Sequence, residues 1–353
     1  MSGRASTVVK QAAAILVHRS GFLRAWIRWK LGKRPLLVMY HRVLESGSDF
    51  SQDGIVVCSD TFERQLLFLA RMFKIVPLNV ACEGNEAFRC AITFDDGWAD
   101  NHRLAFPELR RLGLPATLFV TTGYIGTPRL FWPERLAFIL QGLKPGELHE
   151  GVTAGLPEGI AQCLPRLSRA SDGAHLDRLI ELLKEVDEKT REDFLERLAH
   201  ARNRESAPLE SRMLDWDQVR DLHRQGFEIG SHTVNHVLLT QADPFRAEEE
   251  IGQSRKQIAA ELQWAPQSFA YPNGNWNPDL TLAVRKAGYV RAVTTDLPWT
   301  ASAEIDSTFA LPRKNLCEGS SKGLFGFSSS VFACEAVGFF DWCRLSWKKQ
   351  QRR

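Results

Sequence analysis

Residues 91–97 (AITFDDG) constrain the fold most, because an apolar run stops there on two adjacent carboxylates. Side chains of neighbouring strand residues point to opposite faces. Asp95 and Asp96 can therefore serve one site only where the strand ends and the chain turns, which Gly97 permits. Such a pair indicates a division of labour, in which one carboxylate binds a metal or holds a partner and the other moves protons. The alternative is a helix cap before residues 99–112, which explains one aspartate but not two.

Two histidines, His232 and His236, follow a second apolar run at residues 227–229. A spacing of four places two side chains on one face of a helical turn. Two imidazoles with a carboxylate as third ligand leave one coordination position open, as catalytic zinc sites require. The alternative is a helix surface that carries two unrelated histidines. Taken together with the Asp-Asp strand end, the pair favours a metal site.

Short apolar runs alternate with helical stretches from residue 35 onward, which predicts a parallel sheet. The predicted strands are 36–40, 74–77, 91–94, 116–121, 227–230, 267–271 and 291–295, and the predicted helices include 59–72, 99–112, 215–225 and 244–262. So many repeats favour a closed barrel over an open sheet, and catalytic groups in such barrels lie where strands end. Asp95, Asp96, His232 and the segment 271–273 fall at such ends, as does His41 after the first strand.

Three motifs, 93–97 (TFDDG), 231–236 (SHTVNH) and 269–274 (FAYPNG), resemble in order and spacing the polysaccharide deacetylase family, also called NodB-like or carbohydrate esterase family 4. The likeness spans roughly residues 35–315, with a poorly matched insert at about 128–212. The resemblance implies an α/β fold, a distorted (β/α) barrel of the NodB homology type with a helical insert. It also implies a metal-dependent hydrolase that removes N- or O-acetyl groups from sugar polymers. We expect three parts: a basic amphipathic segment 1–34, the barrel 35–320, and an aromatic and basic segment 321–353.

The resemblance also assigns roles to the site residues. Asp96, His232 and His236 are expected to hold a divalent metal, with zinc as the expected ion, while Asp95 acts as general base. An acetamide is a poor electrophile, so its carbonyl must be polarised while a base takes a proton from water. The backbone of Tyr271, Pro272 and Asn273 is expected to form a rigid turn whose N–H, that of Asn273, stabilises the oxyanion.

The chain departs from the family pattern at two positions. Ala270 stands where an arginine commonly orients the base aspartate, and no histidine follows His236, although many members use a late histidine as general acid. We therefore predict that His41 protonates the leaving amine, because it lies at a strand end like the other catalytic candidates. A structural role is the alternative for His41. His102 is the rival acid, and its own alternative is a helix-surface position.

The N-terminal segment is basic, and no acidic residue precedes Glu45. Its apolar run 12–17 is short and is broken by His18-Arg19, so we read no cleaved export signal. Apolar and basic residues alternate there at helical spacing, a pattern typical of a helix on an anionic membrane surface. The alternative is a helix packed on the barrel. The apolar positions are Ile15, Phe22, Leu23, Trp26, Ile27 and Leu31.

Charge and cysteine usage limit the partners and the compartment. A net charge of +3 over 353 residues is too small to indicate nucleic acid as a partner. Seven cysteines without a Cys-x-x-Cys spacing favour a reducing compartment. We therefore expect a cytoplasmic chain with peripheral contact at the inner face of the membrane.

Three functions of different classes remain open. The first is hydrolysis of N-acetyl groups on a polysaccharide or lipid-linked glycan that contains N-acetylhexosamine. The second is a metal-dependent amidohydrolase acting on a small non-sugar amide. The third is a catalytically inactive barrel that binds glycans, and the intact set of Asp95, Asp96, His232 and His236 argues against it, since grouping such polar side chains is costly without a metal.

Overall fold

The computed structural model describes residues 2–47, 54–141, 173–203, 213–295 and 307–351, with a few residues between 152 and 162. The chain divides into two compact units, which are described one at a time. The barrel unit comprises residues 1–48, 54–126 and 214–353. The helical unit comprises residues 49–53 and 127–213.

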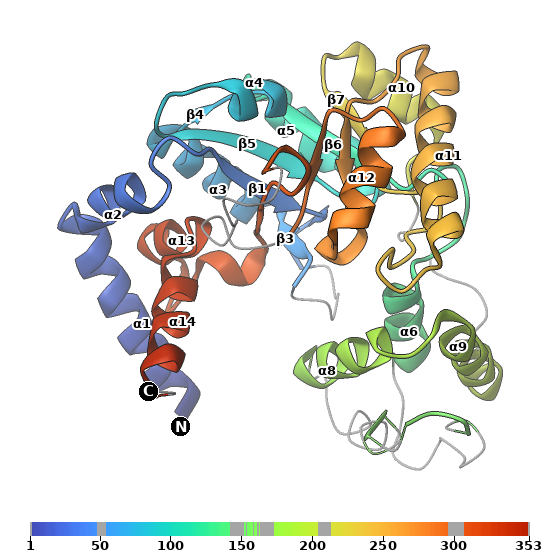
Figure 1. Cartoon of the computed structure of the whole chain (residues 1–353). Coiled ribbons are helices and arrows are strands. Elements are labelled where there is room, and N and C mark those ends of the chain that lie inside the picture. The colour runs from blue at the N-terminus through green and yellow to red at the C-terminus, as the bar shows by residue number, and fades with distance from the viewer. Residues whose placement is uncertain are drawn as a thin grey trace. The chain divides into compact units, whose positions relative to one another are not determined.

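A parallel sheet forms the centre of the barrel unit (Figure 1). Its strands lie in the order β10-β1-β5-β6-β7-β8-β9, and a short strand, β4, pairs with the start of β5. Residues 311–315 close the sheet, because Leu311 bridges Val293 in β9 and the following β10 pairs with β1. The predicted distorted (β/α) barrel is thus confirmed. The strands are β1 (Leu36–Tyr40), β4 (Lys74–Ile75), β5 (Arg89–Phe94), β6 (Ala116–Val120), β7 (Glu228–Ser231), β8 (Ser268–Ala270), β9 (Arg291–Val293) and β10 (Lys314–Asn315).

The strands β1, β5 and β6 are buried along their whole length. Strands of a parallel sheet that is covered on both faces read as continuous apolar runs rather than as alternating ones. Tyr40 and Phe94 stack at the ends of β1 and β5, with ring centroids 5.6 Å apart, and Phe62 of the next helix contacts both rings. This aromatic packing fixes the end of β5, from which Asp95 and Asp96 follow directly.

Helices flank the sheet of the barrel unit. They are α3 (Ser59–Met72), α4 (Leu78–Glu83), α5 (Phe106–Arg111), α10 (Trp216–Arg224), α11 (Pro244–Leu262) and α12 (Pro278–Lys286), and two short strands, β2 (Arg42–Leu44) and β3 (Val56–Cys58), pair apart from the main sheet. The bounds of α3 and α11 coincide with the prediction. The helix predicted over 99–112 differs, because it begins with a π-helical turn at Asn101–Ala105. Such turns are rare and occur often at functional sites.

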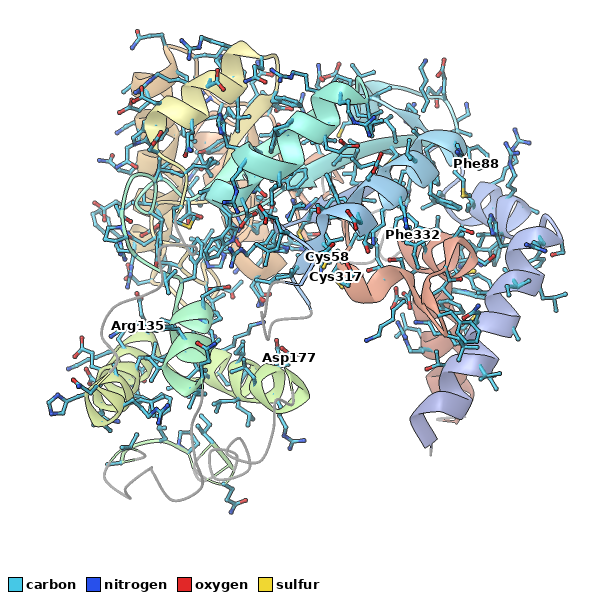
Figure 2. The ribbon with its side chains drawn as sticks, turned by 180° about the vertical axis from the view of Figure 1, so that it is seen from behind. Cys58, Phe88, Arg135, Asp177, Cys317 and Phe332 are labelled. Atoms are coloured by element: carbon cyan, nitrogen blue, oxygen red, sulfur yellow. The ribbon has the colours of Figure 1, made fainter. Side chains whose placement is uncertain are left out.

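Helices from both ends of the chain pack together at one side of the barrel unit (Figure 1). They are α1 (Ser2–Arg19), α2 (Phe22–Lys30), α13 (Ser329–Ala336) and α14 (Phe339–Gln351), with a hairpin of β11 (Lys322–Gly323) and β12 (Gly326–Phe327) between the barrel and α13. Phe332 of α13 contacts Phe68 of α3, which joins this group of helices to the barrel core (Figure 2).

The expected membrane face of residues 1–34 is wrong for four of its six apolar positions. Leu23, Trp26, Ile27 and Leu31 are buried in the same core as β1, so for them the helix is packed on the barrel. Ile15 and Phe22 remain exposed. No helix in the described part of the chain is long and apolar enough to cross a bilayer.

The helical unit is built from α6 (Trp132–Leu140), α8 (Gly173–Lys184) and α9 (Glu188–Arg202). It has its own apolar core, which includes Leu136, Leu179 and Leu195. Arg191 of α9 lies over the Trp132 ring, and Arg135 of α6, labelled in Figure 2, pairs with Glu192.

Candidate active site

Asp96, His232 and His236 converge on one point at the carboxyl ends of β5 and β7. Their donor atoms all lie within 4.8 Å of one another, and Asp96 Oδ1 is 3.6 Å from Nε2 of each histidine. Tetrahedral zinc with bonds of about 2.0–2.1 Å holds its ligand atoms roughly 3.3–3.4 Å apart. The three donors therefore fit a single ion of that size.

The histidines are not carried by a helical turn, so that part of the prediction was wrong. His232 continues from β7, where its backbone N–H donates to the Val120 carbonyl, and residues 232–236 form an irregular loop. Thr233 and His236 have φ of 67° and 57°. The left-handed region is unfavourable for a β-branched residue such as Thr233. It is this backbone turn that brings the second imidazole to the first, with ring centroids 4.8 Å apart.

Hydrogen bonds around the three donors orient them. The Ala270 carbonyl lies 2.8 Å from His232 Nδ1, so that nitrogen carries the proton and Nε2 presents its lone pair to the site. Burial lowers the pKa of His232, which favours the neutral form that a metal requires. The Trp98 indole N–H donates to Asp96 Oδ2 at 3.0 Å, so the other oxygen, Oδ1, faces the histidines.

Glu250 of α11 anchors the histidine loop, and sequence reasoning missed it. Its buried carboxylate accepts the backbone N–H groups of Val234 at 2.9 Å and Asn235 at 2.8 Å, and it also accepts the Asn235 side-chain amide. Three donated hydrogen bonds hold the carboxylate in place and hold the loop between the two ligands. The sequence predicted that Glu250 lies on the helix 244–262. It gave no indication that its carboxylate contacts the histidine loop.

Asp95 is not one of the three donors, and it forms a buried ion pair with Arg313. The guanidinium donates to both oxygens of Asp95, at 2.7 and 2.6 Å, and also to Thr93 Oγ1 and the Thr294 carbonyl. Burial is the largest single influence on the pKa of Asp95 and raises it, but the charge and hydrogen bonds of Arg313, together with His232 and His41, outweigh burial and lower the pKa to about 2. Asp95 is therefore ionised over the whole neutral range.

Arg313 changes the interpretation of Ala270. The sequence lacks an arginine at position 270, which we took as a missing partner of the base. The partner is present, but it comes from the segment before β10 rather than from β8. The cation after Leu311-Pro312 was visible in the sequence, and only the closed barrel shows that it reaches Asp95.

His41 lies at the site, whereas His102 is engaged elsewhere. Asp95, Arg313 and His232 all act electrostatically on His41, and its Nδ1 is a buried atom with no hydrogen-bond partner in the described part of the chain. Burial lowers the pKa of His41 to about 4, so the ring is neutral at pH 7. His102 bonds through Nε2 to Asp221 of α10 at 2.9 Å and is partly exposed.

The Tyr271-Pro272-Asn273 segment forms a tight turn after β8. The Tyr271 side chain is buried in the core, where its hydroxyl donates to the Phe309 carbonyl, so only the backbone of this residue remains for a site role. Asn273 has a φ of 56°, and its carbonyl accepts from Thr295 Oγ1 at 3.1 Å. The expected turn is present, and the role of its backbone in binding an oxyanion stays a prediction.

Backbone with positive φ is concentrated in the segments that carry the site residues. Seven non-glycine residues in the described ranges have positive φ, and four of them belong to the segments that carry the site: Asp96, Thr233, His236 and Asn273. Such conformations cost of order 1–3 kcal/mol each and persist where the surrounding structure enforces them, often at functional sites.

The fold and these residues together define a class: a parallel (β/α) barrel in which an ion-paired aspartate precedes a candidate metal site of three donors. A sequence model of the family described as "Polysaccharide deacetylase" matches residues 84–292, more than half of the chain. The chain belongs to the polysaccharide deacetylase family. The matched segment contains Asp95, Asp96, His232 and His236, whereas His41 and Arg313 lie outside it.

Relatives and solved structures agree with this family. The chain is 22% identical over 309 residues to YxkH of Bacillus subtilis (strain 168), which is named for polysaccharide deacetylation, and the match covers 86% of this chain and 78% of YxkH. The fold is similar to that of the Streptococcus pyogenes deacetylase PplD in complex with acetate (TM-score 0.51, 18% identity, 81% of this chain and 94% of that one). It is also similar to IcaB from Ammonifex degensii (TM-score 0.52, 16% identity, 87% and 98%).

Proposed function

We propose that this enzyme is a metal-dependent hydrolase of N-acetyl groups on N-acetylhexosamine units of a polysaccharide or a lipid-linked glycan. One observation carries the metal dependence: a base aspartate, Asp95, is held by Arg313 beside three donors that fit one ion. Burying two adjacent carboxylates and two imidazoles is costly unless each has a partner. Arg313 is the partner of Asp95, and a cation is the partner that Asp96 and the histidines are arranged to receive.

The donor set favours zinc. Two imidazole nitrogens and one carboxylate oxygen, Nε2 of His232 and His236 with Oδ1 of Asp96, are the kind of ligands found at catalytic zinc sites, which keep a further position open. A divalent ion bound there supplies Lewis acidity, which polarises a carbonyl and lowers the pKa of water.

The residues of the chain divide the remaining chemistry among them. Asp95 takes a proton from the attacking water, whose oxygen forms a bond to the acetyl carbonyl carbon. The backbone N–H of Asn273 donates to the oxyanion of the tetrahedral intermediate. The carbon–nitrogen bond then breaks, acetate leaves, and His41 gives a proton to the amine. Because His41 is neutral at pH 7, it must first receive a proton. We propose that Asp95 passes on the proton that it took from the water, which returns Asp95 to its ionised form.

The inactive glycan-binding barrel loses one of its two supports. It rested on the absence of an arginine partner for the base and on the absence of a late histidine. Arg313 supplies the first, and for the second we propose His41 in place of the late histidine. A metal-dependent amidohydrolase on a small non-sugar amide uses the same groups, so the substrate panel must separate it from the deacetylase.

The test combines metal analysis with acetate release. The protein is purified, stripped with a chelator and reloaded with zinc or another divalent ion, and acetate is measured with N-acetylhexosamine oligomers of different linkage, an O-acetylated glycan and small N-acetyl amides. We expect one ion per chain and acetate release from the N-acetylated oligomers that the chelator abolishes and the ion restores.

Two outcomes would overturn the proposal. If reloaded protein binds no ion in stoichiometric amount, the metal site is wrong. If one ion binds and only the small amides are hydrolysed, the amidohydrolase is the correct function. An Asp95→Asn protein that carries the ion serves as the inactive control for contaminating activity.

A further inference from the structure

The helix α1 has an apolar face that nothing in the described part of the chain covers. Ala14 and Val17 face inward, where α1 packs on α13. Four apolar side chains on the outward side remain open to solvent: Val8, Val9, Ile15 and Leu16, which are 47%, 68%, 38% and 72% exposed. Ile15 and Leu16 follow Val8 and Val9 by seven residues, which is about two helical turns. The two pairs therefore lie on the same side of the helix and form one stripe.

Further exposed aromatic side chains lie on two segments that contact α1. The turn between β11 and β12 is attached to α1, since the Leu324 backbone N–H donates to Gln11 Oε1 at 2.6 Å, and Phe325 at its tip is 97% exposed. On α2, Phe22 and Trp29 are 51% and 67% exposed, although their neighbours Leu23 and Trp26 are buried. The terminal-helix surface is the set Val8, Val9, Ile15, Leu16, Phe22, Trp29 and Phe325.

The charge around the terminal-helix surface has a single sign. No acidic residue occurs in residues 1–44, and Arg19, Arg28 and Lys33 are exposed with no carboxylate partner in the described part of the chain. The nearby carboxylates of the C-terminal helices are already occupied, because Glu335 pairs with Lys10 and Asp341 pairs with Lys314 and Arg344. Arg19, Arg28 and Lys33 are therefore available to an external anion.

We propose that the terminal-helix surface lies on an anionic bilayer and holds the enzyme there as a peripheral protein. An amphipathic helix with Leu and aromatic side chains on one face and Lys or Arg beside them rests in the headgroup region of such a membrane. Clustered basic residues near the helix add attraction to anionic lipids. Trp29 has an amphipathic ring and Phe325 has an apolar ring, and both kinds of ring enter this region.

A second copy of the chain fits this surface poorly. A symmetric contact would place the same patch on both partners. Two faces that both lack acidic residues and both carry Arg19, Arg28 and Lys33 would repel each other. A phospholipid surface supplies both the apolar interior and the negative charge.

Vesicle flotation of the full chain tests the proposal. Vesicles of phosphatidylcholine alone are compared with vesicles that also contain phosphatidylglycerol, at low and at high salt. We expect flotation with the anionic vesicles only, and a decrease at high salt because exposed charges are screened. Val9→Glu with Leu16→Glu should reduce the floated fraction by at least about tenfold, since charges are costly in the apolar boundary of a bilayer.

The control is Phe245→Glu, which changes an equally exposed side chain, 77% exposed, on α11. It should float like the parent chain, and all variants should retain the parent's thermal midpoint and acetate release from a soluble substrate. Failure of the parent to float with anionic vesicles overturns the proposal, as does unchanged flotation of Val9→Glu with Leu16→Glu. If the parent is a dimer that this double variant dissociates, the surface belongs to a second copy and the proposal is wrong. The outcomes that would overturn the proposal, flotation and oligomeric state, do not depend on the metal site.

Discussion

Asp95 and Asp96 are adjacent, yet their side chains have different partners. Asp95 faces a guanidinium that occupies both of its oxygens, whereas Asp96 directs one oxygen to two imidazoles and the other to an indole N–H. The positive φ of Asp96, 78°, and of Gly97 after it turns the chain at the strand end and separates the two directions. The division of labour expected from the sequence thus has a geometric basis.

The first prediction tests that division. Asp95→Asn should lower kcat by about two to four orders of magnitude, the usual contribution of a general base, and should keep the metal. Asp96→Asn should lose metal affinity, because the neutral amide replaces a charged ligand. Elemental analysis and acetate release on the same samples distinguish the two. If Asp95→Asn loses the metal and Asp96→Asn keeps it, the roles of base and ligand must be exchanged between the two residues.

The second prediction concerns Arg313 as a positioning residue. Arg313→Lys cannot reproduce the two parallel hydrogen bonds to Asp95. We expect kcat to fall on the order of 100-fold, as a small misplacement of a reacting group can cost, with metal content and KM close to those of the parent. Because Arg313 lowers the pKa of Asp95, the acidic limb of the kcat/KM profile should move to higher pH.

The matched control for Arg313 is Arg291→Lys. Arg291 is also a buried arginine at the sheet, but it contacts Ser268 and Glu83 instead of the site. If both variants lose activity equally and neither shifts the acidic limb, Arg313 has a structural role only.

The third prediction compares two histidines. His41→Gln should lower kcat by about two to four orders of magnitude with metal content unchanged, because the leaving amine loses its proton donor. His102→Gln should leave turnover near that of the parent, since His102 is bonded to Asp221 on the helix surface. Near-parental activity of His41→Gln across the pH range would exclude His41 as the acid.

At the scale of elements, the histidine loop depends on a helix that follows it. Glu250 of α11 accepts two backbone N–H groups from residues 234 and 235, between the two ligands. Residues that orient ligands through hydrogen bonds commonly affect metal affinity by about 10–100-fold when changed.

The fourth prediction follows from this contact. Glu250→Gln keeps the size of the side chain but replaces one acceptor oxygen by an NH2 group, which cannot accept the N–H groups of the histidine loop. We therefore expect metal binding to weaken by about tenfold. Glu249→Gln, the exposed neighbour on the same helix, is the control and should bind like the parent. Equal affinities in a competition titration with a chelator would show that the loop holds its shape without Glu250.

The sequence indicated most of the strands and the two ends at which the site forms, because buried parallel strands leave an unmistakable apolar run. The histidine pair was expected on a helical turn, and this was wrong because a spacing of four does not record the positive φ of Thr233 and His236. Arg313 could not be assigned, since it is separated from Asp95 by 218 positions and meets it only when the sheet closes. Leu23 and Trp26 were misplaced because an amphipathic pattern does not tell protein from membrane.

At the scale of the whole molecule, α1 is held to the C-terminal helices in part by His18. Its Nδ1 lies 3.1 Å from Ser330 Oγ, and its ring contacts Phe68 of α3 edge to face. Burial and the neighbouring Arg19 lower the pKa of His18, so the folded protein binds this proton less readily than the unfolded chain. The stability from this group is present above the unfolded pKa of about 6.5 and is lost as pH falls below it.

The fifth prediction is a pH dependence of that contact. Between pH 7.5 and pH 5.5, the free energy of unfolding should decrease more for the parent than for His18→Gln, which has no titrating ring. Urea titrations at both pH values give the difference. The protection factors of α1 amides, which correct exchange for its intrinsic pH dependence, should decrease at the lower pH in the parent. Identical pH dependence in the two proteins would remove His18 from this role.

The closure of the sheet by residues 311–315 has a consequence for biosynthesis. Chains fold as they emerge from the ribosome, N-terminal parts first. Until residue 313 has been made, Asp95 lacks its cation, and β1 and β9 remain open edges of the kind that invite intermolecular pairing. A nascent or prematurely terminated chain can therefore contain every residue of the three family motifs and still be unable to turn over substrate. Catalytic competence is acquired in one late step, when the final strand enters the barrel.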